Sequence, residues 1–225
     1  KDDYTVLSVT DYSVSFDDVL LENISFELKS GEKVAIVGPN GTGKTTLIKD
    51  ILKNNHLSIK IDENINYACL SQLTDENIDE TKTVFEVMEN LGFETKESIS
   101  GYLEKFCLEG DALKQKVGQL SGGEKNLLKI AMIANTNAEL LILDEPTSHL
   151  DIYVQMAVEK AISEYKGAVL MISHDFYLIA NCADHVLLVE DKTLKRMRTR
   201  TFRKMVYDKY FNKEEIEKNY KLPVL

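Results

Sequence analysis

The sequence predicts an α/β fold built around a mainly parallel β-sheet, and two observations support this prediction. Apolar runs of strand length alternate with segments of helical spacing along most of the chain. Two of these runs, at residues 139–146 and 168–175, end in polar side chains, and a third, at residues 34–37, leads into a glycine-rich turn. Because the carboxyl ends of parallel strands meet at one edge of such a sheet, we expect a binding site at that edge.

The composition and net charge limit the classes of protein to which this chain can belong. The chain has 225 residues, of which 44% are hydrophobic and 28% charged, and this suits one large domain. A net charge of −10 disfavours attraction of nucleic acid over the whole surface. The three cysteines lie far apart, so we expect reduced thiols in a cytoplasmic protein rather than disulfides or a metal site. No apolar run is long enough to span a bilayer, so we expect no membrane insertion.

The first thirty residues predict two antiparallel strands. Apolar and polar residues alternate between residues 4 and 30, and a bend is expected near Asp17 and Asp18. Phe16 lies just before this bend. Its ring would suit stacking on an adenine, but the spacing alone favours an ordinary aromatic residue of the core.

Residues 38–46 lie between the apolar run 34–37 and a helical pattern at residues 47–52. Their glycine, lysine and threonine spacing is typical of a phosphate-binding loop, in which backbone N–H groups and the helix N-terminus face one anion. Lys44 would reach the β- and γ-phosphates, and the Thr45 hydroxyl would bind Mg²⁺. The loop residues expected to contact a nucleotide are Gly38, Pro39, Asn40, Gly41, Thr42, Gly43, Lys44, Thr45 and Thr46.

The composition and the apolar spacing change in the middle of the chain. Residues 66–72 predict a strand that ends in the polar residue Gln72, and the residues from 73 to about 135 carry helical spacing in a sequence rich in charge. We therefore expect a helical subdomain inserted into the α/β core. Within it, Ser121 and Glu124 fit a capping box at the start of a helix. Locally, a second phosphate site at Ser121, Gly122 and Gly123 is an equally good interpretation.

The two polar strand ends carry the residue types that a hydrolytic site needs. Asp144 follows a buried apolar run and would hold Mg²⁺ through water, while Glu145 would polarise an attacking water. His174 follows the next such run and would contact a γ-phosphate.

The last part of the chain is basic. Seven of the thirteen residues 192–204 are Lys or Arg, and none is acidic. Contact with nucleic acid phosphates and a solvated strand or hairpin are equally good interpretations of this run. We expect residues 192–225 to form a basic and C-terminal tail segment, whose last part, residues 208–225, is a helix that docks elsewhere in a parent protein. The chain begins at Lys1 rather than Met, and we expect it to be a piece of a longer protein.

Taken together, these motifs resemble the ATP-binding cassette (ABC) ATPases over nearly the whole chain. The resemblance implies a P-loop ATPase that uses ATP and Mg²⁺, with Glu145 as the catalytic base and Lys44 and His174 on the phosphates. It implies that the Phe16 ring stacks on the adenine. It also implies a metal site formed by Thr45, Gln72 and Asp144, in which Gln72 senses the ion. It also implies contacts in trans: the signature residues would bind the nucleotide of a second cassette, beside the D-loop. These residues are Ser121, Gly122, Gly123 and Glu124 of the signature and Ser148 and Asp151 of the D-loop.

Details resemble the ABC-F branch of this family, whose members are soluble tandem cassettes that often act on the ribosome. Lys125 follows Glu124 in the signature, and residues 144–151 are similar to the branch pattern except for Ser148, where Asn is usual. The resemblance implies a second cassette as partner and contacts with ribosome, rRNA or tRNA through the parent protein. Antibiotic-resistance factors belong to the same branch. The alternatives are an ATPase subunit of a membrane transporter and a nucleotide-gated binding module with little turnover.

Overall fold

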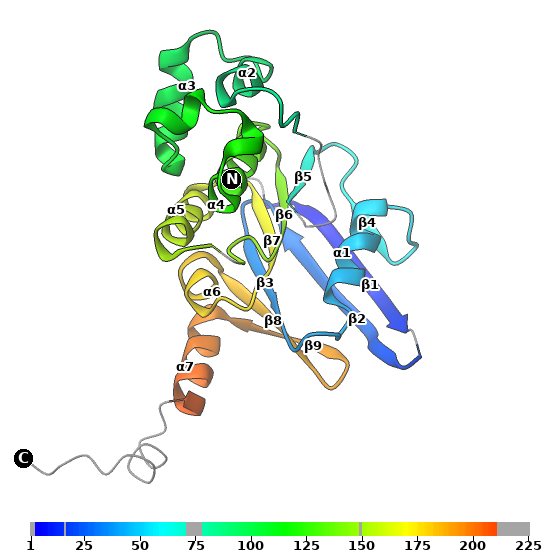
Figure 1. Ribbon diagram of the computed structural model, residues 1–225. Helices are drawn as coiled ribbons and strands as arrows, with labels where there is room; N and C mark the ends of the chain where they lie inside the picture. The colour runs from blue at the N-terminus through cyan, green and yellow to red at the C-terminus, as the bar shows by residue number, and fades with distance from the viewer. Residues whose placement is uncertain (1–2, 16, 71–77, 149, 211–225) are drawn as a thin grey trace, which may run out of the picture.

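The computed structural model describes residues 3–15, 17–70, 78–148 and 150–210. Two sheets dominate this part of the chain (Figure 1). A six-stranded sheet has the order β5-β6-β7-β3-β8-β9, and all neighbours in it are parallel except β8 and β9. Its strands are β3 (Lys33–Val37), β5 (Tyr67–Leu70), β6 (Leu140–Asp144), β7 (Ala168–Ile172), β8 (His185–Glu190) and β9 (Thr193–Arg198).

An antiparallel sheet of order β2-β1-β4 packs beside the first, as the alternation at the start of the chain predicts. Its strands are β1 (Thr5–Ser15), β2 (Val19–Lys29) and β4 (Ile59–Ile61). The turn between β1 and β2 lies at the expected bend near Asp17 and Asp18. The fold class inferred from the sequence, an α/β domain with a mixed core sheet and an N-terminal antiparallel sheet, is therefore confirmed.

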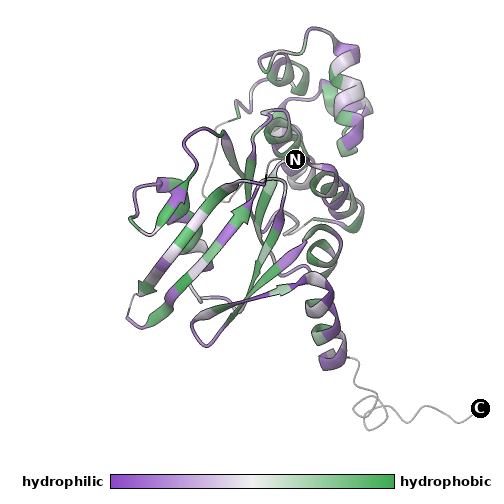
Figure 2. Ribbon diagram, turned by 180° about the vertical axis from the view of Figure 1, so that it is seen from behind, coloured by the Kyte–Doolittle hydropathy of each residue, from purple (hydrophilic) through white to green (hydrophobic). Residues whose placement is uncertain are grey.

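Side chains of the central strands alternate between two hydrophobic clusters, as expected for strands covered on both faces. Leu141, Leu143 and Met171 point into the cluster shared with α4 (Gly122–Ala134), α5 (Ile152–Glu164) and α6 (Phe176–Cys182). Ile142 and Leu170 point the other way, into the cluster shared with α1 (Lys44–Lys53) and the antiparallel sheet. Figure 2 shows this core as green strands bordered by purple loops and helix faces.

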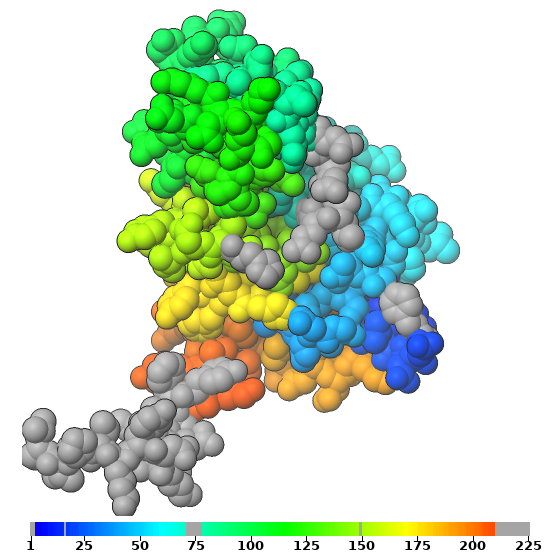
Figure 3. All heavy atoms as spheres, viewed as in Figure 1, coloured from blue at the N-terminus to red at the C-terminus, as the bar shows by residue number. Residues whose placement is uncertain are grey.

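Helices cover the central sheet and form a lobe at one end of the molecule. The elements from Val84 to Ala134 are all helical, and in Figure 3 this green segment caps the upper end. Whether residues 73–135 form a separate subdomain stays a prediction. The α-helices are α1 (Lys44–Lys53), α2 (Val84–Glu89), α3 (Lys96–Leu103), α4 (Gly122–Ala134), α5 (Ile152–Glu164), α6 (Phe176–Cys182) and α7 (Thr199–Tyr210). Short 3₁₀ turns occupy Glu104–Phe106, Gly110–Lys114 and Val117–Gln119.

The basic run matches the expected strand or hairpin only in its first part. That part is the edge strand β9, which forms an antiparallel hairpin with β8, whereas helix α7 begins at Thr199. The helix is fixed at its start because the Thr199 hydroxyl donates to the Ala183 carbonyl at 2.7 Å, and the buried Phe202 packs against Phe176. Two anchors among many charges give too little apolar periodicity to reveal a helix in the sequence.

None of the helices in the described part of the chain is both long and apolar enough to cross a membrane.

We expect the central strands to dominate stability. Ile142 is fully buried, so Ile142→Ala should lower the free energy of unfolding by about 2–5 kcal/mol, through lost burial and a cavity. Urea unfolding followed by circular dichroism measures this change. Leu57→Ala removes the same kind of side chain from a fully exposed position and should change stability by less than about 0.5 kcal/mol. Equal losses in the two variants would contradict the assignment of the core.

Candidate functional site

The glycine loop connects β3 to α1 in a shape that side chains would block. Gly43 has a φ of 90°, and a Cβ atom built on it would lie 3.0 Å from Val14 Cγ1. A Cβ atom on Gly38 would lie 2.7 Å from Val189 Cβ, closer than real contacts allow. The loop therefore curls tightly against β8, and its backbone N–H groups precede the N-terminus of α1 as a phosphate site requires.

Lys44 is held inside this loop by backbone carbonyl groups. Its ammonium donates to Gly38 O at 2.7 Å and to Pro39 O at 2.6 Å. A lysine ammonium has three N–H donors, so these bonds position the group and leave one donor for a ligand. The Thr42 hydroxyl also donates to Pro39 O, at 2.9 Å, and this bond closes the exposed side of the loop.

Asp144 and Glu145 follow β6 at the same sheet edge. Asp144 is the last residue of β6 and lies opposite Ile172 of β7. The Glu145 N–H donates to Ile172 O at 2.8 Å, although Glu145 has left-handed backbone with a φ of 51°. Non-glycine residues seldom adopt this conformation, and such residues recur at active sites.

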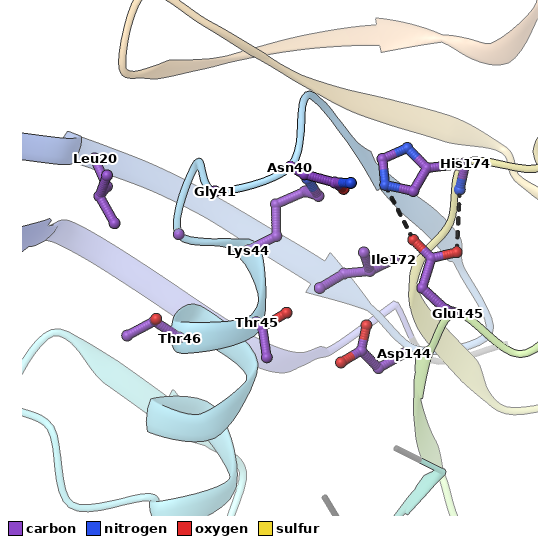
Figure 4. Close-up of a pocket in the computed structure, with 11 residues that line it drawn as sticks. Leu20, Asn40, Gly41, Lys44, Thr45, Thr46, Asp144, Glu145, Ile172 and His174 are labelled. Atoms are coloured by element: carbon purple, nitrogen blue, oxygen red, sulfur yellow. Dashed lines mark hydrogen bonds and ion pairs between the residues drawn. The ribbon is translucent and has the colours of Figure 1, made fainter. Parts of the chain in front are cut away.

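His174 and Glu145 hold each other. His174 Nε2 lies 3.3 Å from Glu145 Oε1, and the His174 backbone N–H donates to Glu145 Oε2 at 3.3 Å. Figure 4 shows both interactions as dashed lines. Both carboxylate oxygens of Glu145 are thus engaged by one residue of the neighbouring strand end.

A second bond joins the same two strand ends. The Thr147 hydroxyl, which is buried, donates to Asp175 Oδ2 at 3.1 Å. The other oxygen of Asp175 accepts from the N–H groups of Tyr177 and Leu178 and so caps α6. Asp175 therefore fixes both the loop after β6 and the start of α6.

The glycine loop and the strand ends enclose one cavity of about 400 Å³ (Figure 4). Most of the expected loop and strand-end residues line it, together with two apolar side chains, Leu20 and Ile172. The lining residues are Leu20, Asn40, Gly41, Gly43, Lys44, Thr45, Thr46, Asp144, Glu145, Ile172 and His174. Leu20 and Ile172 carried no signal in the sequence that separated them from other apolar strand residues.

Burial shifts the charged groups of the cavity. It raises the pKa of Asp144 above its ordinary value, and the Lys44 ammonium offsets part of this rise. It also raises the pKa of Glu145, against the opposing influence of His174. Burial lowers the pKa of Lys44, while Glu145 and Asp144 act in the other direction. Burial therefore disfavours the charged form of each of these groups. A cation beside the carboxylates or an anion beside Lys44 would favour the charged forms again.

The residue types present fit Mg²⁺. The Thr45 hydroxyl and the Asp144 carboxylate face each other across the cavity (Figure 4), and oxygen ligands of this kind suit the ion. No group of three or more His, Cys, Asp or Glu residues that could hold a metal occurs in the described ranges. Mg²⁺ is usually held by one or two protein carboxylates together with water and phosphate oxygens.

The signature residues lie apart from this cavity. Ser121 caps α4: its hydroxyl accepts from the Glu124 N–H at 3.2 Å, and Glu124 Oε2 accepts from the Ser121 N–H at 2.8 Å. The predicted capping box is therefore confirmed. A Cβ atom on Gly122 would meet nothing within 4 Å, so the start of α4 is open. Neither Gly122 nor Gly123 lines the cavity, as expected if these residues serve a nucleotide held by another cassette.

The two D-loop residues, Ser148 and Asp151, lie at different places in the structure. Ser148 lines a second cavity, of about 90 Å³, which Asp144, Glu145 and residues of α4 also line. Asp151 caps α5, because its Oδ1 accepts from the N–H groups of Tyr153 and Val154. This cap starts α5 at Ile152. Phe16 and Gln72 lie outside the described residues, so their expected roles stay predictions.

The fold and the cavity define a P-loop nucleotide-binding domain. The family model described as "ABC transporter" matches residues 21–148, which is more than half of the chain, so the chain belongs to this family of ATP-binding domains. Among solved structures it is similar to "Structure of ATP binding subunit of ABC transporter", with a TM-score of 0.72, 22% identity and coverage of 90% of this chain and 93% of the other. "RNase-L Inhibitor" gives a TM-score of 0.73 at 24% identity, covering 93% of this chain and 43% of that one.

Curated relatives support the ABC-F branch. ABC transporter F family member 5 of Arabidopsis thaliana is 38% identical over 85% of this chain and 28% of its own length. The energy-dependent translational throttle protein EttA of Escherichia coli strain K12 is 34% identical over 83% of this chain and 35% of its own length. The chain therefore spans about a third of the length of the curated relatives that it matches.

The raised pKa of Asp144 predicts the sign of a stability change. The folded protein holds a proton on this carboxyl more readily than the unfolded chain does, so folding stability falls as pH rises through the raised pKa. At neutral pH the ionised group is therefore unfavourable in the nucleotide-free protein. Asp144→Asn should raise the Tm at pH 7, and the gain should shrink as the pH falls toward about 4, where the unfolded carboxyl also takes up its proton.

Thermal unfolding without nucleotide or Mg²⁺, followed by circular dichroism between pH 4 and pH 8, measures this difference in Tm. Asp208→Asn is the matched control, because Asp208 is exposed on α7. An Asp144→Asn variant that is less stable than the parent chain at pH 7 would contradict the assignment.

Proposed function

We propose that this domain binds and hydrolyses ATP as one cassette of a soluble, cytoplasmic ABC-F protein that acts on the ribosome. The observation that carries the proposal is the convergence of Lys44, Asp144, Glu145 and His174 on one cavity of about 400 Å³ beside a phosphate-binding loop. Phosphoryl transfer asks a protein mainly for positioning and for groups that match developing charge, and this set provides both.

Each residue has a role that its geometry supports. The free donor of Lys44 would contact a phosphate oxygen, while Gly38 O and Pro39 O keep the ammonium in place. Thr45 and Asp144 would hold Mg²⁺, which offsets phosphate charge when it is bound. Glu145 would orient and deprotonate the attacking water. One of the Glu145 carboxylate oxygens lies 3.3 Å from His174 Nε2, and a γ-phosphate within reach of His174 would compete for that imidazole and free the oxygen.

A second cassette completes the proposed site. The open start of α4 lies outside the cavity, so Ser121, Gly122, Gly123 and Glu124 would contact the nucleotide of the partner cassette. A structurally similar cassette, with a TM-score of 0.69 and 20% identity, is described as a dimer in a post-hydrolysis state bound to ADP and Pi. ATP between two cassettes would hold them closed, and hydrolysis would let them open.

The proposed role in translation rests on the similarity of this chain to its curated relatives. EttA is named a translational throttle protein, and the chain matches about a third of its length. The alternative is the ATPase subunit of a membrane transporter, and fractionation of the full-length protein between ribosomes and membranes separates the two. A role in antibiotic resistance requires the whole parent protein and is tested by drug sensitivity of cells that lack it.

Glu145→Gln tests the proposed base. The variant keeps the shape of the side chain but not its basicity, so ATP binding should persist while turnover falls by about 10²–10⁴-fold. Phosphate release and equilibrium binding of a fluorescent ATP analogue measure the two quantities. Glu94→Gln changes an exposed carboxylate and should alter neither. Turnover of the Glu145 variant within a few-fold of the parent chain would show that Glu145 is not the catalytic base. Negligible turnover by the parent chain itself, at every protein concentration, would favour a nucleotide-gated binding module.

Complementation between two inactive chains tests the pair. Lys44→Ala removes the phosphate contact, and Gly122→Asp adds an anion at an open helix start without a steric clash. Each variant alone should be inactive. A mixture in equal amounts forms one intact site in each mixed dimer, so activity should return to about a quarter of the parent value if the dimers assemble at random. A mixture that stays inactive, although both variants bind their partners, would exclude contacts in trans.

A further inference from the structure

One face of α7 carries cations that the ATPase site does not use. The sequence has four arginines in all, and they lie together at Arg196, Arg198, Arg200 and Arg203, in a chain whose net charge is −10. Lys204 extends the group. This concentration is not explained by composition, because the other basic residues of the chain are lysines and are spread along it.

The helical spacing puts three of these cations on one face. Arg200, Arg203 and Lys204 are related as i, i+3 and i+4, which brings their side chains together on the same side of α7. All three are exposed. The opposite side of the helix packs on the core through Phe202 and Val206, so the direction of the basic face is fixed. Figure 1 shows α7 projecting from the end of the molecule away from the helical lobe.

These three cations have no bonded partner among the described residues of the domain. In the described part of the chain, none of Arg200, Arg203 and Lys204 makes a hydrogen bond or ion pair through its side chain. Arg196 is different, because it donates to Glu27 O at 2.9 Å and pairs with Glu32. Like charges at these spacings repel one another, and Arg200 also lies at the helix N-terminus, where the helix dipole disfavours a cation. Asp208 is the only acidic residue of α7.

We propose that this basic face, Arg200, Arg203 and Lys204 with Arg198 at its edge, binds the phosphate backbone of RNA. Arginine presents a planar fork of donors that matches phosphate oxygens, and a polyanion would relieve the repulsion within the face. An anionic membrane fits less well, because Phe202 and Val206 of α7 are already packed on the protein. The choice of RNA as the polyanion rests on the proposed function in translation.

A charge-neutralised variant tests the proposal. The chain with Arg200→Gln, Arg203→Gln and Lys204→Gln should bind a fluorescein-labelled RNA hairpin at least about tenfold more weakly than the parent chain. Its slope of log affinity against log salt should fall by about 2–3, near one for each cation that no longer meets a phosphate. Fluorescence anisotropy at several KCl concentrations, without ATP, gives both quantities. Lys105→Gln, Lys160→Gln and Lys166→Gln together make the matched control, because they remove the same charge from exposed positions elsewhere.

Two further measurements keep the outcome clear. The Tm of the α7 variant without RNA should equal or exceed that of the parent chain, which shows that weaker binding does not come from unfolding. Its ATPase activity, measured without RNA, should be unchanged, so failure of this proposal is separate from failure of the proposed ATPase. Equal RNA affinity and salt slope in the variant and the parent, or binding to phosphatidylserine vesicles but not to the hairpin, would overturn the proposal.

Discussion

The parallel register of β6, β7 and β3 is the constraint on which the site depends. β3 leads into the glycine loop, while β6 and β7 end at Asp144 and Ile172, which lie opposite each other in the ladder. A shift of one residue in this pairing would turn Asp144 or Ile172 toward the other face of the sheet. Because buried apolar side chains alternate along both strands, such a shift is strongly disfavoured. The hydrophobic core therefore sets the distance between the phosphate loop and the carboxylates.

Local patterns made the loop and the strand ends predictable, and non-local contacts limited the rest. Residues 38–46 and the tips at Asp144 and His174 were recognisable because each pattern lies within one short stretch of chain. The bond between Thr147 and Asp175 joins residues 28 positions apart, and the hold of His174 on Glu145 depends on which strands become neighbours. Strand order is set by packing of the whole domain, so a linear pattern does not reveal these pairs.

Helix α7 shows a different limit. The many charged residues in this segment left no apolar pattern that predicts a helix. The helix is fixed by a hydrogen bond from Thr199 to Ala183 and by the ring contact of Phe202 with Phe176. The sequence therefore indicated a basic segment correctly, but not its shape. Shape matters here, because a strand would alternate these cations between two faces, whereas the helix gathers Arg200, Arg203 and Lys204 on one.

The contacts between Glu145 and His174 have a consequence for how the site responds to a ligand. The imidazole Nε2 lies 3.3 Å from one carboxylate oxygen, and the backbone N–H of the same residue donates to the other oxygen. A ligand that draws the imidazole toward itself frees the first oxygen, while the backbone bond still fixes the direction of the side chain. A single residue can therefore release one acceptor of Glu145 without letting the carboxylate rotate away.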